Sequence, residues 1–362
     1  MKTRITKTLE ELISIRSISR EPEECRKAID YVRNHFADTS FCLQKFEYQH
    51  VFSLIISKKK TMNFDLIFLG HLDVVPAQPS AFTPRIEDDW LYGRGAIDMK
   101  GPVAVMLELF KAHESDPAFD NFALVLTTDE ELGGASGVGY LIEQQNLQAK
   151  TVFNPDGGDT FTPCISEKGV FHLELFTEGL SVHGSRPWEG ANALELLLED
   201  IERIKSAFDF ATEEEQNKIS FNLGRLQGGK VANLVPNLAE ASIDIRFPPE
   251  MNSKEILNKI TACINNSRIE VRASGEAIQI SKDDPSFTLL QEELSNLGFP
   301  KKEFHANGAS DARWFVPQGS SILLIKPEGK GVHQHNEAVK LESLSVLYKL
   351  MENYSQKYAL SL

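Results

Sequence analysis

The stretch FDLIFLGHLD, residues 64–73, decides the fold of this 362-residue chain. Its first six residues are almost continuously apolar, which is typical of a β-strand buried on both faces of a sheet. The strand passes directly into His71 and Asp73, whose side chains can take part in metal sites. We therefore expect an α/β fold with a largely parallel sheet, in which polar groups follow the ends of buried strands.

Two more apolar runs end in the same way. The run NFALVLTT, residues 121–128, is soon followed by Glu130 and Glu131, and the run that begins at Thr151 is followed by Asp156. Ligands of open α/β sheets collect beyond the carboxyl ends of the strands, so we expect these carboxylates to converge on the end of the first strand. The helices expected between the strands span residues 101–113 and 137–145.

A second architecture interrupts the first. Residues 170–177 alternate between apolar and polar side chains, as a half-exposed strand does, and two helical patterns accompany further strands. Two helices on an antiparallel sheet form an α+β sandwich. From about Asp283 the α/β pattern returns. We predict one domain of residues 1–171 and 280–362 that receives an inserted domain of residues 172–279.

Composition excludes some classes of function. Hydrophobic residues make up 41% and charged residues 25% of the chain, which argues for a folded protein. The net charge of −14 disfavours nucleic acid and anionic membranes as partners, because both require a basic surface. No secretory signal pattern is present, and no stretch approaches the roughly 18 apolar residues of a membrane span. The four cysteines form no C-x-x-C pair, so we expect free thiols in a cytoplasmic protein.

Each candidate ligand is ambiguous when it is taken alone. His71 and Asp73 point the same way on an extended segment, so the carboxylate can take the second ring N–H of a metal-bound imidazole. A lone H-x-D motif, however, more often only closes a turn. Glu130 and Glu131 are adjacent like charges, which are costly to bury together unless a cation neutralises them. Alone, the pair could equally be an acidic surface loop.

Two glycine-containing segments supply further candidates. Asp98 lies in LYGRGAIDMKG, where a dinucleotide-binding fingerprint would require a third glycine, so an oxidoreductase is a poor alternative. The segment GVHQHNE supplies either His333 or His335, and the spacing to Glu337 favours His333. Two histidines with several carboxylates suit zinc or a neighbouring transition metal better than calcium or magnesium.

Taken in order, these motifs resemble those of one family. The motifs are G-H-x-D-V-V, G-R-G-x-x-D-x-K-G, T-D-E-E-x-G-G and a late histidine four residues before an acid. The chain resembles the co-catalytic zinc family of acetylornithine deacetylase, succinyl-diaminopimelate desuccinylase, glutamate carboxypeptidase and cytosolic di- and tripeptidases, over essentially its whole length. The resemblance implies a phosphorylase/hydrolase-like catalytic domain with a mixed, largely parallel sheet. The inserted domain is then a ferredoxin-like α+β lid and dimerisation domain.

The resemblance also implies a role for each candidate ligand. One Zn²⁺ is held by His71 and Asp156, the other by Glu131 and His333, and Asp98 bridges the two; Co²⁺ or Mn²⁺ are alternative metals. Asp73 then orients His71. Glu130 is the general base that takes a proton as a metal-bridging hydroxide attacks the amide carbonyl, and returns it to the leaving amine. The peptide bond between Asp98 and Met99 is cis in relatives, and we expect the same here.

Further residues are implied to meet the substrate. His183 resembles a lid histidine that polarises the carbonyl in the active site of the partner subunit, which implies a homodimer. Asn233 and Arg246 match residues that bind the substrate carboxylate, although Arg246 could instead form a salt bridge on the sheet face. Lys168 and Gly308 match segments that line the pocket. Asp311 and Arg313 match such a segment as well, or form a structural pair.

One departure from the deacylase pattern bears on the substrate. Deacylases usually place Glu-Pro where this chain has Asn-Pro-Asp156, and an aspartate there is more like the peptidases; Asp159 is the alternative ligand. We therefore expect hydrolysis of a small peptide or N-acyl amino acid with a free carboxylate. An acetylornithine or succinyl-diaminopimelate type of deacylase is the alternative. A metal-binding regulatory relative without activity is a further alternative, but it would have no need of the base Glu130.

Overall fold

The computed structural model describes all of residues 1–362, and these divide into two compact units. Unit 1 comprises Met1–Ile165, Ile280–Ala306 and Ser310–Leu362, and unit 2 comprises Ser166–Gln279 and Asn307–Ala309. The segment over which the sequence predicts an insertion, residues 172–279, lies within unit 2.

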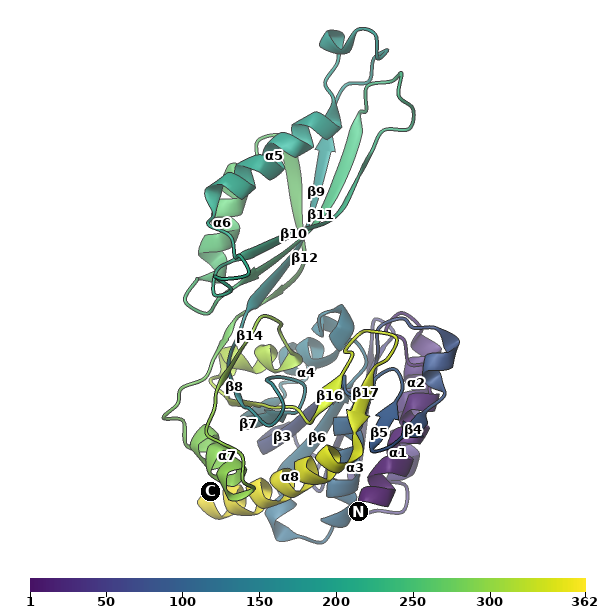
Figure 1. The fold of residues 1–362 in the computed structure, drawn as a ribbon, viewed down its shortest axis with the longest axis vertical. Coiled ribbons are helices and arrows are strands. Elements are labelled where there is room, and N and C mark those ends of the chain that lie inside the picture. The colour runs from purple at the N-terminus through teal and green to yellow at the C-terminus, as the bar shows by residue number, and fades with distance from the viewer. The chain divides into compact units, whose positions relative to one another are not determined.

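A mixed sheet forms the centre of unit 1 (Figure 1). Its strands, in spatial order, are β1 (Cys42–Tyr48), β2 (Val51–Ser57), β6 (Phe122–Thr127), β3 (Asn63–His71), β7 (Gln148–Asn154), β15 (Ser321–Leu324), β8 (Cys164–Glu167) and β13 (Ile278–Gln279), with β14 (Phe304–Ala306) paired to β8. The four strands β6, β3, β7 and β15 run parallel, and the flanking pairs are antiparallel. The sequence prediction of an α/β fold with a largely parallel sheet is confirmed.

Helices of unit 1 cover this sheet and bury their apolar faces against it. These helices are α1 (Lys2–Ser14), α2 (Pro22–His35), α3 (Lys100–Ala112), α4 (Tyr140–Glu143), α7 (Pro285–Asn296) and α8 (Leu341–Ser361). Helix α3 is buried along almost its whole length and packs between α1, α8 and the strands β3 and β6. A side chain at Gly70 would collide with Met106 of α3, so this glycine lets helix and strand approach closely just before His71.

A small second sheet in unit 1 joins distant parts of the chain. Its order is β16 (Gly329–Lys330), β17 (Ala338–Lys340), β5 (Trp90–Tyr92) and β4 (Arg85–Glu87), all antiparallel. The pairing of β17 with β5 brings the segment after residue 92 beside the segment before residue 338.

Unit 2 is an α+β sandwich, as the sequence predicts. Its antiparallel sheet has the order β10 (Ser220–Gly228), β11 (Leu238–Phe247), β9 (Gly169–Glu178) and β12 (Ser267–Gly275). Alternate residues of β9 and β11 are buried, and they form a core with the apolar faces of α5 (Ala193–Ala207) and α6 (Ser253–Cys263). Both helices begin at an asparagine whose side chain accepts a hydrogen bond from the first turn.

The helix predicted over residues 137–145 is present, but it ends at Glu143 and begins in π-helical form. The π-helix η4 (Ala135–Gly139) passes directly into the single α-helical turn of α4. The carboxylate of Asp129 accepts hydrogen bonds from the amides of Ser136 and Gly137 and so holds the first turn of this helix. Gly137 and Gly139 lower the helix propensity of this segment. Asn146, which has a left-handed backbone conformation, follows the end of the helix. None of the helices has the length and apolar character that a membrane crossing needs.

Candidate metal centre

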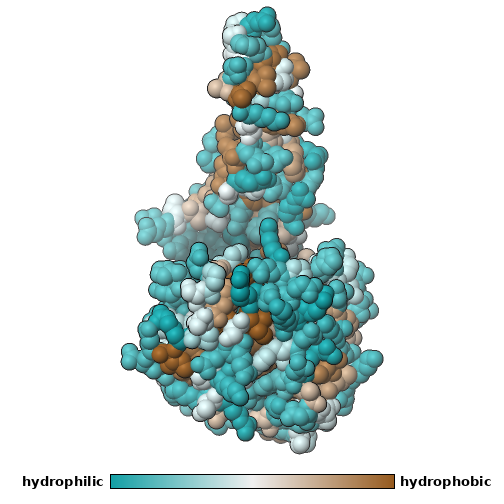
Figure 2. All heavy atoms as spheres, turned by 90° about the vertical axis from the view of Figure 1, so that its right-hand side faces the viewer, coloured by the Kyte–Doolittle hydropathy of each residue, from teal (hydrophilic) through white to brown (hydrophobic).

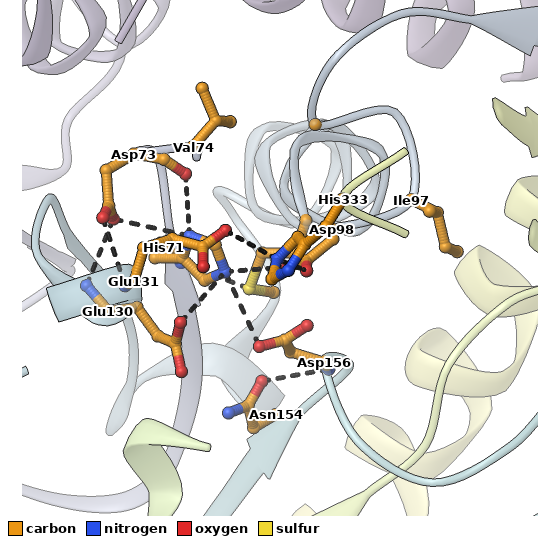
Figure 3. Close-up of polar contacts among 12 residues, drawn as sticks. His71, Asp73, Val74, Ile97, Asp98, Glu130, Glu131, Asn154, Asp156 and His333 are labelled. Carbon is orange, nitrogen blue, oxygen red and sulfur yellow. Dashed lines mark hydrogen bonds and ion pairs between the residues drawn. The ribbon is translucent and has the colours of Figure 1, made fainter. Parts of the chain in front are cut away.

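The site lies where three neighbouring parallel strands end (Figure 3). His71 is the last residue of β3, and Glu130 and Glu131 form the short turn η3 (Glu130–Leu132) just after β6. Asp156 follows β7 by two residues. Because β6, β3 and β7 are adjacent and parallel, their carboxyl ends place these four side chains together, as expected from the sequence.

His71 is the centre of the first group of side chains. Its Nε2 lies 3.2 Å from Oδ1 of Asp98, 3.6 Å from Oδ2 of Asp156 and 3.9 Å from Oε2 of Glu130. The ring is almost fully buried, so it presents this nitrogen to the carboxylates and not to bulk solvent. Ligand atoms of His71, Glu130 and Asp156 all lie within 4.8 Å of one another.

A second group adjoins the first through Asp98. Oδ2 of Asp98 lies 3.1 Å from Nε2 of His333, and Oε1 of Glu131 lies 3.2 Å from the same nitrogen. Asp98 therefore directs one carboxylate oxygen to each histidine. This arrangement suits a residue that bridges two cations.

The structure distinguishes between the two pairs of alternative ligands. His335 belongs to neither group and instead lines a separate cavity of about 900 Å³ beside Tyr92 and Arg94. The carboxylate of Asp159 accepts a hydrogen bond from the amide of Thr160 in its own turn. The geometry thus favours His333 and Asp156.

Asp73 is completely buried and holds parts of the site together (Figure 3). Its backbone oxygen lies 2.9 Å and its Oδ1 3.4 Å from Nδ1 of His71. The carboxylate also accepts hydrogen bonds from the amides of Glu130 (3.2 Å) and Glu131 (3.3 Å) and from the hydroxyl of Ser19 (2.7 Å). Asp73 thus orients the histidine and fixes the turn that carries both glutamates.

The carboxylates that surround the two histidines shift the pKa of both. Burial alone would lower the pKa of His71, but contacts with Asp156, Asp73 and Asp98 outweigh it and raise that pKa well above its ordinary value. Contacts with Asp98 and Glu131 raise the pKa of the second histidine, His333, to about 10.

The pKa values of the carboxylates are shifted as well. Burial raises the pKa of Asp156 to about 7, with a further contribution from the charge of Asp98. Burial also raises the pKa of Glu130 well above its usual range. Five carboxylates share this space with two imidazoles, and a pair of divalent cations would neutralise most of their charge. The set of imidazole and carboxylate donors therefore fits zinc-class ions.

A second carboxylate pair lies behind the glutamate turn. Burial, with the charge of Asp311, raises the pKa of Asp129 to about 8, and burial raises that of Asp311 to about 6. Arg313 lies 3.9 Å from Asp311 and donates to the backbone oxygens of Gly133 (2.6 Å) and Ser310 (2.8 Å). Asp311 and Arg313 are thus buried beside the turn that carries the glutamates.

The sequence does not reveal the roles of three residues that shape the site. Ser19 donates to Asp73, and Arg94 and Glu337 link the loops of Asp98 and His333. The G-R-G motif and the acid after the late histidine were the available signals for the last two. The peptide bond between Asp98 and Met99 is cis, as expected.

The predicted lid residues lie in unit 2. The segments of His183 and Asn233 are joined, since Gly184 donates from its amide to the oxygen of Asn233 (2.8 Å). Nδ1 of the exposed His183 lies 2.8 Å from the hydroxyl oxygen of Ser185 and accepts the amide N–H of the same residue (3.2 Å).

Of the other residues predicted to bind substrate, Arg246 and Lys168 contact other residues of the chain, and Gly308 has no neighbouring atoms where a side chain would be. Arg246 forms a two-point ion pair with Asp244, with bonds of 2.8 and 3.2 Å, which is the alternative that the sequence left open. Lys168 donates to the backbone oxygens of Gln216 and Lys218, so it fixes a neighbouring loop. Gly308 has open space where a side chain would be.

Comparisons with known proteins identify the family of the chain. The pattern of peptidase family M20/M25/M40 matches residues 67–357. A succinyl-diaminopimelate desuccinylase from Xanthomonas campestris is 26% identical over 312 residues, covering 79% of this chain and 82% of that enzyme. The corresponding enzyme from Xylella fastidiosa is 27% identical over 315 residues, with the same coverage.

Solved structures share the fold over nearly the whole chain. An M20 family metallo-carboxypeptidase from Sulfolobus solfataricus superposes with a TM-score of 0.81 at 19% identity, covering 98% of this chain and 99% of that one. A tripeptidase from Staphylococcus aureus superposes with a TM-score of 0.80 at 19% identity, covering 99% of each chain. The chain belongs to peptidase family M20/M25/M40 and is a metal-dependent hydrolase of amide or peptide bonds.

Proposed function

We propose that the protein is a di-zinc hydrolase that cleaves the amide bond of a small peptide or N-acyl amino acid with a free carboxylate. One observation carries the proposal: Asp98 directs its two carboxylate oxygens to His71 and His333, each of which has a further carboxylate beside it. Such a pair of groups would hold two divalent ions. When bound, these ions supply an activated water and polarise the amide carbonyl.

The residues of the chain provide the proton transfer. Glu130 lies in the group around His71 but belongs to the turn that Asp73 fixes, so its carboxylate is held beside the ions. In our proposal it takes the proton of the attacking water and passes it to the leaving amine nitrogen. Asp73 accepts from His71 on the side away from the ions, which keeps Nε2 free for binding.

Unit 2 would supply the groups that recognise the substrate. His183 is exposed, and its ring would donate to the carbonyl oxygen of the scissile amide, as the resemblance implies from a partner subunit. Asn233 and Arg246 remain candidates for the substrate carboxylate. Arg246 would have to share its guanidinium with Asp244. The contacts of Lys168 favour a structural role over substrate binding.

The substrate class has two candidates. The aspartate at position 156 favours small peptides, and two of the structural neighbours are a carboxypeptidase and a tripeptidase. The desuccinylase relatives favour an N-succinyl amino acid, and so support the deacylase alternative.

We also propose a homodimer formed through unit 2, in the cytoplasm. Large hydrophobic side chains are exposed on this unit, at Leu180, Trp188, Val231 and Leu238. Figure 2 shows hydrophobic side chains gathered towards the upper end of the unit in that view. Exposed apolar groups of this kind support a protein interface. All four cysteines are free, which supports a reducing compartment.

The decisive experiment combines metal content with activity. The zinc-loaded protein is assayed against dipeptides, N-acetyl amino acids and N-succinyl amino acids, beside the variants Glu130→Ala and Glu143→Ala. We expect Glu130→Ala to retain its zinc and to lose activity by about 10²–10⁴-fold, the usual contribution of a general base. The exposed Glu143 of the nearby α4 is the control, and its removal should change nothing. Equal rates for wild type and Glu130→Ala contradict the base, and absence of bound metal contradicts the centre.

A further inference from the structure

A buried carboxylate outside both ligand groups joins the two loops that carry Asp98 and His333. Glu337 is only 2% exposed, and it precedes strand β17. It belongs to neither metal-ligand group. A buried carboxylate is costly unless it is paired and fully hydrogen-bonded, so its partners indicate what it does.

Both oxygens of Glu337 are saturated by the loop of Asp98. Oε1 accepts the backbone amides of Ile97 (3.1 Å) and of Asp98 itself (3.2 Å). Oε2 accepts the amide of Gly95 (3.0 Å) and Nη1 of Arg94 (2.5 Å). Four donors on one carboxylate fix the path of the backbone up to the residue that lies between the two histidines.

Arg94 completes the connection on the other side. Its Nη2 donates to the backbone oxygen of His333 (3.1 Å), while its Nη1 is held by Glu337. The backbone oxygen of Glu337 also accepts the amide of Gly93 (3.0 Å). The pairing of β17 with β5 brings the two loops together, and the ion pair then fixes them to each other at the site.

We infer that Glu337, together with Arg94, is a positioning residue for the metal centre: the buried pair sets the spacing between Asp98 and His333 and thereby the affinity for the divalent ion held there. Neither residue belongs to a ligand group. The inference rests on the proposed metal centre, and it adds residues that hold the ligand loops in place.

The geometry requires a glutamate at this position. Glutamine would replace one of the two oxygens by an NH₂ group. In the position of Oε1 this group would face the amides of Ile97 and Asp98, and in the position of Oε2 the amide of Gly95 and the guanidinium of Arg94. Aspartate is one methylene shorter and cannot reach both sets of donors. Each replacement leaves buried donors without an acceptor and lets the two loops separate.

The test measures zinc affinity and not only activity. Metal-free wild type and Glu337→Gln are titrated with Zn²⁺ in competition with a chromophoric chelator, and the Co²⁺ absorption spectrum reports the ligand geometry. We expect the weaker of the two zinc dissociation constants to rise about 10–100-fold in Glu337→Gln, as is usual when a group behind a ligand is removed. Activity should return at higher Zn²⁺ concentration with KM unchanged. Because bound Zn²⁺ also stabilises the folded state, a matched variant is needed to separate this effect from a general loss of stability.

Glu293→Gln is the matched control. Glu293 is equally buried in the same unit, but it pairs with Lys357 and Asn296 and not with the ligand loops. Its removal should lower stability and leave both zinc constants unchanged. Arg94→Lys is a second variant, and it tests the positioning role if Glu337→Gln does not fold. A lysine keeps the charge but cannot donate to Glu337 and His333 at once, and we expect about a tenfold weaker second constant.

The zinc titrations distinguish failure of the proposed metal centre from failure of the positioning role. If wild type binds no Zn²⁺, the proposed function fails. If wild type binds two ions and a folded Glu337→Gln or Arg94→Lys variant binds both with unchanged affinity, the positioning role is wrong while the proposed function stands.

Discussion

Oδ2 of Asp98 lies 3.1 Å from Nε2 of His333, although the two residues come from loops far apart in the sequence. The other oxygen of Asp98 lies 3.2 Å from His71. The carboxylate is thus shared between two groups of ligands, whereas each histidine belongs to only one. This difference leads to a prediction about the number of bound ions.

Asp98→Ala should lose both ions, and His333→Ala should lose only one. Removal of the shared carboxylate weakens both groups, while His71 and Asp156 persist when His333 is absent. Elemental analysis after dialysis measures this directly, with about two zinc ions per chain expected for wild type, about one for His333→Ala and none for Asp98→Ala. Equal metal content in the two variants would show that Asp98 is not shared.

Asp73→Asn should weaken metal binding without removing a ligand. The replacement loses the negative charge beside His71. The amides of Glu130 and Glu131 donate to different oxygens of Asp73, so the NH₂ group of asparagine would face one of them. We expect zinc affinity or activity to fall about 10–100-fold. Ser19→Ala removes a single donor to the same carboxylate and should have a smaller effect. The role of Asp73 is contradicted if chelator competition gives the same zinc constants for Asp73→Asn and wild type.

Gly134→Ala should impair both stability and activity. Gly134 has φ +67° and a side chain there would collide with the buried carboxylate of Asp311, beside the glutamate turn. Gly298 has φ +88° but open surroundings, so Gly298→Ala tests the backbone strain alone, about 1–2 kcal/mol. Urea unfolding and kcat should show a larger stability loss and reduced turnover only for Gly134→Ala. If both variants lost the same unfolding free energy and Gly134→Ala kept full activity, the glutamate turn would have adapted to the added side chain, and the prediction would be wrong.

Asp200→Asn should destabilise unit 2 in a pH-dependent manner. Burial alone would raise the pKa of Asp200, but hydrogen bonds from the amides of Asn265 and Asn266 and the hydroxyl of Ser267 outweigh it and lower that pKa. The ionised carboxylate therefore contributes stability in full above the unfolded pKa of about 3.9, and the contribution is lost as the pH falls through the folded pKa.

At pH 7 we expect the variant to lose about 2–3 kcal/mol of unfolding free energy, because hydrogen bonds to a charged group are lost. Urea-unfolding midpoints of the wild type and of Asp200→Asn should approach each other near pH 3. Glu202→Gln, on the exposed side of the same helix, should cost almost nothing at either pH. A gap between Asp200→Asn and wild type that is the same at both pH values would exclude the carboxylate as its cause.

The sequence predicts much of the site because the strands are apolar and the polar residues follow them directly. Strands β3 and β6 and the second half of β7 are buried, so their apolar runs mark them. The parallel arrangement of these strands then brings His71, Glu131 and Asp156 together. The alternation in β9 likewise indicates a sheet that is covered on one face by helices.

Contacts made across distant loops could not be predicted in this way. Lys168 matched a pocket segment in sequence, but its partners are backbone oxygens of a loop, and no side-chain pattern reveals a backbone partner. Arg94 and Glu337 likewise become a pair only through the small sheet that β17 forms with β5. The short strands of that sheet carry no periodic pattern in the sequence.

The most direct test of the metal centre is anomalous X-ray diffraction, at the zinc absorption edge, from crystals grown with Zn²⁺. We predict two peaks about 3.5–4 Å apart, one beside His71 and Asp156 and the other beside Glu131 and His333. The carboxylate of Asp98 should lie between them. A map without peaks at this position, or with zinc bound only by other residues, would contradict the account.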